Sequence, residues 1–386
     1  MKNSEIKDNI KRLVEELQKV RRPESEKIGW KRISAIYGGK ESDYIPILVD
    51  TPAHFINYAV DYNLREQFFS KEKMLYATLK RMIGAAKIDC DGQLCLRANL
   101  GTVLIPSLFG IHPTVIEHNQ PWCKEHLSKE EILHFRIPED LSQVGLMPKA
   151  LDYMAYFQEI VGDLAHVYLP DTDGPFEIAH LVYGDNIFTE IYDDPRFIHR
   201  LLGLTTKMFI RATEVLKEAL GEPRDSGYHG HGMSYGIYMS KGGTRISDDT
   251  PVLLSPKHIK EFVTLYDGEI SASFSGGWIH YCGYNISLTE EFMKMNEIRG
   301  INLGNPEKWD PKEFMKMILD HGKFYFGSWK RNDNEPLANY FRRIIGYLDG
   351  RRKGLIFLLE PANTLQIGEV EHAASLWREI QDEELG

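Results

Sequence analysis

Residues 271–285 read SASFSGGWIHYCGYN, and this stretch decides both the fold and the candidate site. Its apolar run stops abruptly at a polar turn, the pattern of a buried parallel strand that delivers side chains to a loop at its carboxyl end. His280 and Cys282 share one side of this strand because side chains alternate with a period of two. An imidazole and a thiol on one face suit Zn²⁺. The alternative is a buried histidine beside an inert cysteine.

The composition is that of a soluble globular protein with enough apolar residues for a sizeable core. The chain has 386 residues, of which 42% are hydrophobic and 26% are charged. Its net charge of −10, spread along the sequence, argues against nucleic acid or an anionic membrane as a partner. Four cysteines are too few for a disulfide framework, and neither a signal peptide nor a long apolar run is present. We therefore expect a cytoplasmic protein.

The order of helical and strand-like segments predicts the architecture. An amphipathic helix, with Ile6, Ile10 and Leu17 on one stripe, indicates an N-terminal helical extension over residues 1–40. Residues 41–386 then alternate strands with helices in about eight units, which is typical of a single (β/α)₈ TIM-barrel domain in the α/β class. Residues 106–145 lack clean periodicity and are interpreted as an elaboration over one end.

Several helix starts carry capping signals. Ser or Asp followed by Pro, or a Ser with Glu three residues later, marks an N-cap. The predicted starts of this kind are Asp194-Pro195, Ser255-Pro256, Asp310-Pro311, Ser128 with Glu131, and Ser287 with Glu290.

Polar side chains gather where the predicted strands end, which in a TIM barrel is the catalytic face. The residues at these ends are Asp50, Asn99, Asp171, Asp173, Asp248, Asp249, His280, Cys282, Asn302, Trp329 and Glu360. Each acid could instead be a helix cap or a turn residue. Asp171 and Asp173 flank Thr172 on one side of an extended segment, so we expect at least one raised pKa unless a cation separates them.

Three motifs together resemble the uroporphyrinogen decarboxylase superfamily. They are DTDGPFEIAHLVYG at 171–184 with the helix start DDP after it, ISDDTPVLLSPKHIKEF at 246–262, and IHYCG at 279–283. The resemblance covers roughly residues 165–385. The resemblance implies one of two activities: decarboxylation of a porphyrinogen, or methyl transfer with a cobalamin (corrinoid) protein. In the methyltransferases of this superfamily, an H-x-C pair and a later cysteine bind a zinc ion.

The methyltransferase branch fits better. The arginine-rich substrate loop of the decarboxylases is not visible, since DTPAHFINYAV at 50–60 contains no Lys or Arg. The overall acidity also argues against a substrate with many carboxylates. The sequence departs from the methyltransferase pattern because no cysteine follows Cys282. Glu360, at the end of the last strand, is the expected third ligand, and His229 and His231 in GYHGHGM are the alternatives.

The resulting interpretation is a zinc-dependent methyltransferase. It would move a methyl group between a small methylated substrate (an ether, amine or thiol) and the cobalt of cobalamin carried on a corrinoid-binding partner. The chain could also form a homodimer. The metal ligands would be His280, Cys282 and Glu360; the catalytic acids Asp171, Asp173 and Asp248; and the substrate-binding residues Asp50, Asn99, His229, His231 and Trp329.

Two rival functions remain at this stage. One is a carboxy-lyase that needs no metal, and the other is a non-enzymatic barrel that only docks the corrinoid subunit. Zinc content separates the first rival from the transferase, and turnover of methylcobalamin excludes the second. Tyr228, Trp329 and Phe55 are expected as exposed aromatics on the loops where a partner docks.

Overall fold

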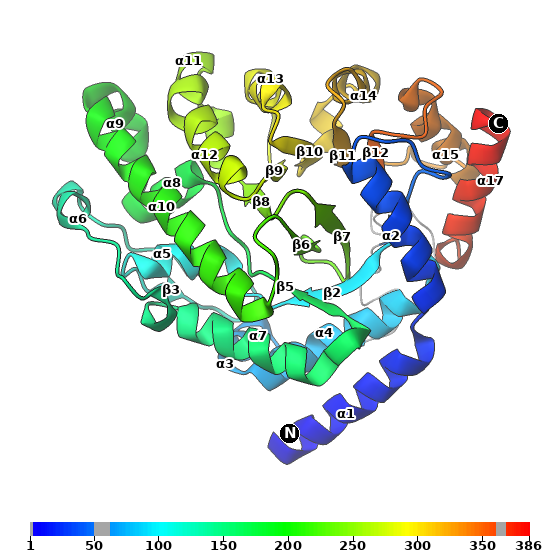
Figure 1. Cartoon of the computed structure of the whole chain (residues 1–386), viewed down its shortest axis with the longest axis horizontal. Helices are drawn as coiled ribbons and strands as arrows, with labels where there is room; N and C mark the ends of the chain where they lie inside the picture. The colour runs from blue at the N-terminus through cyan, green and yellow to red at the C-terminus, as the bar shows by residue number, and fades with distance from the viewer. Residues whose placement is uncertain (1–2, 50–61, 360–367) are drawn as a thin grey trace.

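The computed structural model describes residues 3–49, 62–359 and 368–386, and it is a mixed α/β structure in which helices surround the strands (Figure 1). The strands in these ranges are β1 (Ile47–Val49), β2 (Gln93–Arg97), β3 (Pro113–Thr114), β4 (Trp122–Cys123), β5 (His166–Tyr168), β6 (Ser226–His229), β7 (Tyr235–Ser240), β8 (Thr244–Ser247), β9 (Gly277–Tyr281), β10 (Ile298–Leu303), β11 (Phe324–Gly327) and β12 (Leu355–Leu359).

The α-helices of the same ranges follow the chain from end to end. They are α1 (Asn3–Val20), α2 (Pro23–Tyr37), α3 (Leu64–Phe69), α4 (Lys71–Ala86), α5 (Leu104–Leu108), α6 (Lys129–His134), α7 (Met147–Val161), α8 (Pro175–Tyr183), α9 (Ile187–Asp193), α10 (Pro195–Leu220), α11 (Pro256–Ile259), α12 (Leu265–Ser273), α13 (Ile286–Lys294), α14 (Pro311–Asp320), α15 (Leu337–Ile345) and α17 (Ala373–Leu385).

Six parallel strands form the larger sheet, in the order β1-β12-β11-β10-β9-β8. β9, β11 and β12 are buried along their whole length. Strands that are buried on both faces read as continuous apolar runs, which explains why LIFLL in β12 shows no polar alternation. Helices α12 to α15 lie on the outer side of these strands (Figure 1), so the main core lies between the two layers.

A second sheet has the order β5-β2-β7-β6, with β2 parallel to β5. Hydrogen bonds join it to the first sheet at two places. The Asp91 backbone N–H donates to the Ile47 carbonyl of β1 at 2.8 Å, and Asp173 forms an isolated parallel bridge with Ser247 of β8. The parallel strands of the two sheets therefore adjoin at both ends. This arrangement is compatible with a TIM-barrel-like fold.

Residues 226–247 depart from the predicted alternation of strands and helices. β6 and β7 form an antiparallel hairpin that pairs Ser226 with Ser240, β7 also pairs antiparallel with β2, and β8 follows without a helix. A hairpin needs only a short loop, whereas parallel neighbours need a long crossover. GYHGHGM thus belongs to the first strand of this hairpin and its loop, not to a strand–helix unit.

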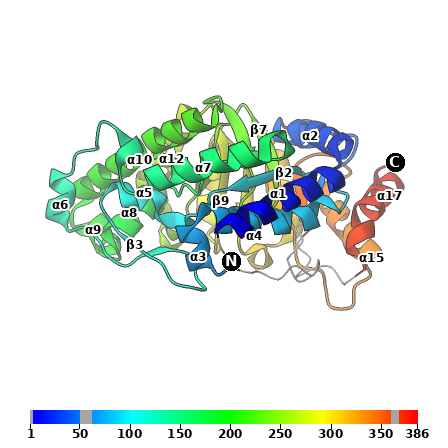
Figure 2. The ribbon, with the colours of Figure 1, turned by 90° about the horizontal axis from the view of Figure 1, so that it is seen from below.

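The N-terminal helix α1 packs against α4, as Figure 2 shows from below. Ile6, Ile10 and Leu17, the stripe predicted from the sequence, are all buried. α1 is thus amphipathic because one face covers α4 while the other stays polar. The boundary at residue 40 stays a prediction.

Most of the predicted helix starts are confirmed. The side chains of Asp194, Ser255 and Asp310 each accept a backbone N–H at the start of their helices, and Ser128 with Glu131 forms a capping box. The predicted box at Ser287 and Glu290 is wrong. α13 begins at Ile286, and Asn285 caps it by accepting the Leu288 N–H.

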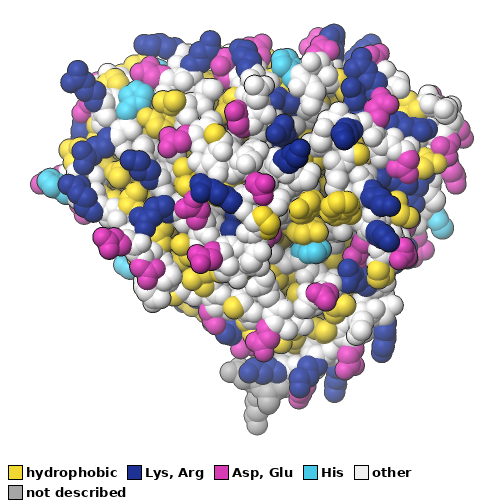
Figure 3. Space-filling model, in the orientation of Figure 1, with side chains coloured by type: hydrophobic (Ala, Val, Ile, Leu, Met, Phe, Trp, Pro, Cys, Tyr) yellow, Lys and Arg dark blue, Asp and Glu magenta, His cyan; other side chains and the backbone are white. Residues whose placement is uncertain are grey.

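The surface carries charges of both signs. Figure 3 shows Lys and Arg side chains mixed with Asp and Glu over one face of the molecule. Within the described ranges, every helix is either too short or too polar to cross a membrane.

Candidate metal centre and active site

Three neighbouring parallel strands bring the candidate site together. The register of β9 places His280 beside Asn302 of β10 and beside Ser247 of β8. Two residues further along, Asp249 and Cys282 leave these strands at the same level. Asp249 Oδ1 accepts the Cys282 backbone N–H at 2.7 Å, which fixes the two segments against each other.

Asn302 sets the orientation of the His280 ring. Its Nδ2 donates to the Phe326 carbonyl at 2.5 Å, so its Oδ1 is free to accept the proton on His280 Nδ1 at 2.5 Å. The Nε2 lone pair of His280 then faces Cys282 Sγ, 3.6 Å away. Burial, followed by the positive charge of Arg245, lowers the pKa of His280 to about 4, so the ring is neutral near neutral pH. Metal-binding histidines are usually held in this way.

Asp249, His280 and Cys282 form a cluster whose ligand atoms all lie within 4.8 Å of one another. Asp249 Oδ1 is 3.9 Å from His280 Nε2. A tetrahedral Zn²⁺ with bonds of about 2.0–2.3 Å holds its ligands about 3.3–3.8 Å apart. The His280–Cys282 distance of 3.6 Å lies in this range, the Asp249 oxygen lies just beyond it, and the oxygen, nitrogen and sulfur donor set suits zinc. Partial burial of the sulfur, and then the charge of Asp249, raises the pKa of the Cys282 thiol to about 11. A cation at this site would favour the thiolate.

The third member of this cluster differs from the ligand predicted from the sequence. Glu360 lies outside the described residues, as does Asp50. The sequence places Asp249 among the polar strand ends without a specific role, and it predicts a catalytic role for the neighbouring Asp248. Because β8 pairs Ser247 with His280, Asp249 stands level with Cys282 and the Asp248 side chain points to the other face. The sequence shows two adjacent acids, but it does not show which of them lies on the same face of the sheet as His280.

Asp171 and Asp173 have opposite electrostatic environments. Asp171 forms ion pairs with Arg97 and, at 3.4 Å, with Arg245. Burial raises the pKa of Asp171, but the charges of Arg97 and Arg245 outweigh burial and hold it below its ordinary value. Burial, followed by the charges of Glu177 and Asp171, raises the pKa of Asp173 well above its ordinary value. The expectation that one carboxyl of this pair has a raised pKa is confirmed for Asp173.

Asp248 lies under the site, between the sheet and its helices. It is fully buried, and its Oδ1 accepts the Glu177 backbone N–H of α8 at 2.9 Å. Burial, and then the charge of Asp267 on α12, raises the pKa of Asp248. Burial likewise raises the pKa of Asp267 to about 8. Two neighbouring carboxyls in this position favour the protonated state.

This buried pair predicts a stability that falls as pH rises. An unfolded aspartate titrates near about pH 3.9, whereas folded Asp267 titrates at about 8. Between these values the folded state binds more protons, so the free energy of unfolding decreases with rising pH. Asp267→Asn removes this titration and keeps the shape. We expect it to flatten the dependence and to be more stable than the parent at about pH 8.

Urea unfolding at several pH values across this window measures the effect. Asp163→Asn, at an exposed carboxyl, is the matched control and should keep the parental slope. A parent chain whose unfolding free energy stayed constant or rose across the window would contradict the assignment.

His229 and His231 lie in and after β6, beside the cluster. The His229 ring is buried, packs against the rings of Tyr168 and Trp278, and accepts the His231 backbone N–H through Nδ1 at 3.1 Å. The His231 ring lies 4.4 Å from the His280 ring, centroid to centroid. The structure therefore brings His231 to the metal cluster and places His229 behind it.

Asn99 and Trp329 are not among the described residues that line the cavity beside His280. Asn99 Oδ1 accepts the Gly101 N–H at 3.3 Å, a local turn contact. Trp329 is buried against the rings of Tyr325 and Tyr347. The expectation of an exposed Trp329 is wrong, because this ring completes an aromatic cluster behind β11.

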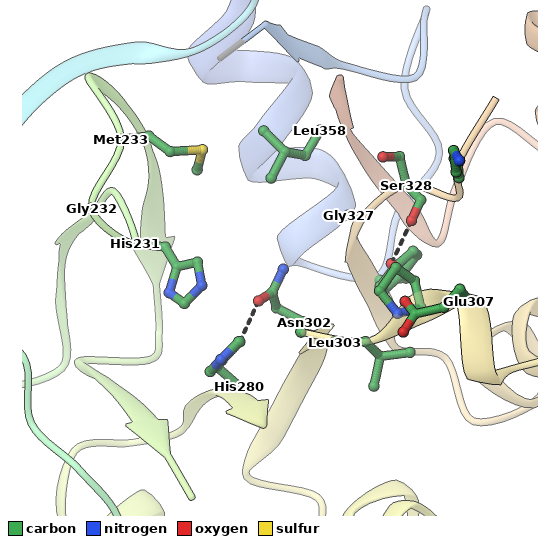
Figure 4. A pocket seen from close by; sticks show the side chains of 14 residues that line it. His231, Gly232, Met233, His280, Asn302, Leu303, Glu307, Gly327, Ser328 and Leu358 are labelled. Atoms are coloured by element: carbon green, nitrogen blue, oxygen red, sulfur yellow. Dashed lines mark hydrogen bonds between the residues drawn. The ribbon is translucent and has the colours of Figure 1, made fainter. Parts of the chain in front are cut away.

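A cavity of about 560 Å³ opens beside His280 (Figure 4). His231, His280 and Met233 stand on one side of it in the figure, and Leu358 and Ser328 stand across from them. This volume lies within the range of about 300–1,000 Å³ that is usual for small-molecule pockets. A small molecule in the cavity would contact the metal cluster through the His280 wall.

Comparison with known proteins gives a fold but no family. No family model matches the chain, and no curated protein matches its sequence. Among solved structures, the chain is similar to a methyltransferase from Methanosarcina mazei, with a TM-score of 0.65 and 16% sequence identity. The similarity covers 91% of this chain and 98% of that chain. The chain therefore shares the fold of that protein over nearly its whole length.

Proposed function

We propose that this chain is a zinc-dependent methyltransferase that moves a methyl group between a small methylated substrate and the cobalt of a corrinoid protein. The observation that carries this proposal is the Asp249–His280–Cys282 cluster, whose His280 lines a cavity of substrate size. The fold shared with a methyltransferase supports it. In this proposal the two sheets close into a (β/α)₈ barrel over residues 41–386, with residues 1–40 as its helical extension.

The residues present fit the metal. His280 Nε2, Cys282 Sγ and the Asp249 carboxylate would hold the zinc, and Glu360 is a further proposed oxygen ligand. Bound zinc would supply a Lewis acid for the heteroatom that carries the methyl group. A ligand set with one thiolate donates less charge than a set with two, and it leaves a harder metal that suits an oxygen substrate.

Among the three predicted acids, Asp173 is the proposed proton donor. Burial and the nearby carboxylates raise its pKa, which favours the protonated form that a general acid requires. Asp171 is ionised and holds Arg97 and Arg245, so its proposed role is to position those side chains. Asp248 faces α8 and α12, which favours a structural role.

An apolar surface borders the cluster and is the proposed docking site of the corrinoid protein. Leu253, after β8, and Tyr284 and Ile286, after β9, are exposed apolar residues on the loops that carry Asp249 and Cys282. Asn285 Nδ2 donates to the Val252 and Leu254 carbonyls at 3.0 Å and joins the two loops. Exposed apolar surface beside a site is common where a protein partner binds.

Metal analysis and a methyl-transfer assay test the proposal together. We expect about one zinc per chain, transfer of methyl groups from methylated ethers, amines or thiols to reduced cobalamin, and negligible substrate loss without a corrinoid. Release of CO2 from a carboxylated substrate by a zinc-free protein without corrinoid would establish the carboxy-lyase instead. A folded chain that binds a corrinoid protein but turns over neither methylcobalamin nor any methylated compound would be a docking protein.

A further inference from the structure

The loop between β6 and β7 holds His231 in an unusual backbone conformation. His231 has a φ of 48°, in the left-handed region that residues other than glycine seldom adopt. Hydrogen bonds fix the backbone on both sides: the His231 N–H donates to His229 Nδ1 at 3.1 Å, and the Gly232 N–H donates to the Tyr168 hydroxyl at 2.9 Å. Conformations of this kind cluster at functional sites, where the surrounding structure enforces them.

Arg245 determines which nitrogen of the His231 ring carries the proton. Its Nη2 lies 2.9 Å from His231 Nδ1, and a guanidinium has only donors, so Nδ1 must accept and Nε2 must carry the hydrogen. Asp171 holds the same guanidinium through Nη1 at 3.4 Å, and the Trp278 ring lies 5.7 Å from its carbon. The tautomer of His231 is therefore fixed by a buried, doubly anchored cation.

The Nε2–H of His231 remains for a ligand. His231 lines the cavity, and its ring lies 4.4 Å from the His280 ring between centroids. Its hydrogen bonds within the described residues use Nδ1 and the backbone N–H. In this tautomer Nε2 has no lone pair for a metal, so His231 fits a donor role and not the ligand role considered from the sequence.

We infer that His231 Nε2–H donates a hydrogen bond to the heteroatom of the methylated substrate, next to the metal cluster. This inference rests on the proposed function and names its substrate class. The metal and the N–H each need a lone pair on the heteroatom, so two are required: a methyl ether or thioether offers two, a neutral amine offers one, and a quaternary ammonium has none. Substrates of this chain are thus neutral methyl ethers or thioethers. Arg245 and Asp171 are positioning residues for His231.

The reaction balances without transferring the His231 proton. The bond between the methyl carbon and the heteroatom breaks, and its electron pair stays on the heteroatom. Reduced cobalt of the corrinoid supplies the pair that forms the new cobalt–carbon bond. The alkoxide or thiolate then takes one proton from Asp173 or from solvent. The hydrogen bond from neutral His231 strengthens as negative charge develops on the heteroatom, which lowers the barrier.

Two variants that keep the same backbone strain distinguish loss of the hydrogen-bond donor from a change in the fold. His231→Leu removes the donor, whereas His231→Gln places an amide N–H near the position of Nε2. With zinc-loaded protein, free reduced cobalamin and anisole or thioanisole as probes, we expect His231→Leu to lose about 10²–10³-fold in kcat, as removal of such donors usually costs, and His231→Gln to recover most of it. Both variants should retain zinc, and tetramethylammonium should not be demethylated.

The tautomer gives a readout that does not depend on methyl transfer. In ¹⁵N-histidine NMR spectra we expect the proton of the His231 ring on Nε2. In Arg245→Met the donor to Nδ1 is lost, so both tautomers should be populated. Calorimetry should show phenol binding more weakly to His231→Leu than to His231→Gln. Protonation at Nδ1, equal phenol affinity, unchanged anisole turnover in His231→Leu, or rapid demethylation of tetramethylammonium would each overturn the inference. If no probe is demethylated, the proposed function fails, and the tautomer and phenol affinity still decide the donor role.

Discussion

His280→Ala and Cys282→Ser should each lose the bound zinc and, with it, nearly all methyl transfer. Each change removes one of three ligand atoms that lie within 4.8 Å of one another. Asn302→Ala should have a graded effect and weaken zinc affinity about 10–100-fold, because it removes the acceptor that orients His280. Elemental analysis and competition with a chromophoric chelator measure both losses.

The two adjacent acids after β8 supply a matched comparison. Asp249→Asn should lower zinc affinity, whereas Asp248→Asn, one residue away on the other face, should not. Glu360→Gln tests the remaining proposed ligand in the same assay. His118→Ala, at an exposed histidine, controls for non-specific metal binding. Full zinc content in both His280→Ala and Cys282→Ser would remove the metal assignment.

Thiol labelling gives an independent view of the same site. Cys282 is exposed, whereas Cys90, Cys95 and Cys123 are buried. A maleimide should therefore modify the metal-free chain at Cys282 and leave the other three thiols intact. Zinc should slow this reaction in the parent chain but not in His280→Ala.

Asp171→Asn should cost the fold about 3–5 kcal/mol, the usual cost of leaving a buried charge without its partner. Asp171 is the carboxylate that pairs with both Arg97 and Arg245, and each of these side chains is largely buried. Without it, two cations lie close together with little water. Urea unfolding measures the loss.

Double substitution distinguishes this effect from a general loss of packing. Arg97→Met combined with Asp171→Asn removes one charge of each sign, so its cost should be smaller than the sum of the two single costs. Asp163→Asn is the surface control. If Asp171→Asn lowered the free energy of unfolding by less than about 1 kcal/mol, these ion pairs would contribute no more to stability than an ordinary exposed pair.

The features that the sequence predicts correctly are local ones. The N-caps at Asp194, Ser255 and Asp310 depend on residues three positions apart, and the shared face of His280 and Cys282 depends only on the period of a strand. The run of strands and helices from β8 onward follows from apolar patterning in the same way. Each of these inferences needs information from one segment only.

The errors concern relations between segments. The choice between Asp248 and Asp249 depends on the register of β8 against β9, which no single strand encodes. β7 pairs antiparallel with β2, which lies more than 130 residues earlier in the chain. This segment is therefore part of an inserted hairpin and not the strand of a strand–helix unit that the sequence predicts. Asn302 lay among the polar strand ends, but its role depends on two contacts made by neighbouring strands. α13 starts early because Asn285 also bonds to the loop after β8.

The pairing of the first strand with the last has a kinetic consequence during synthesis. Ile47 of β1 lies beside Phe357 of β12, and Trp377 Nε1 of α17 donates to the Ile45 carbonyl at 2.8 Å. At roughly 5–20 residues per second, a ribosome needs about 15–60 s to reach β12 after making β1. During this time the apolar edge of β1 is exposed, because its parallel neighbour β12 has not yet been made. The nascent chain is therefore an expected client of chaperones that shield exposed strand edges until translation ends.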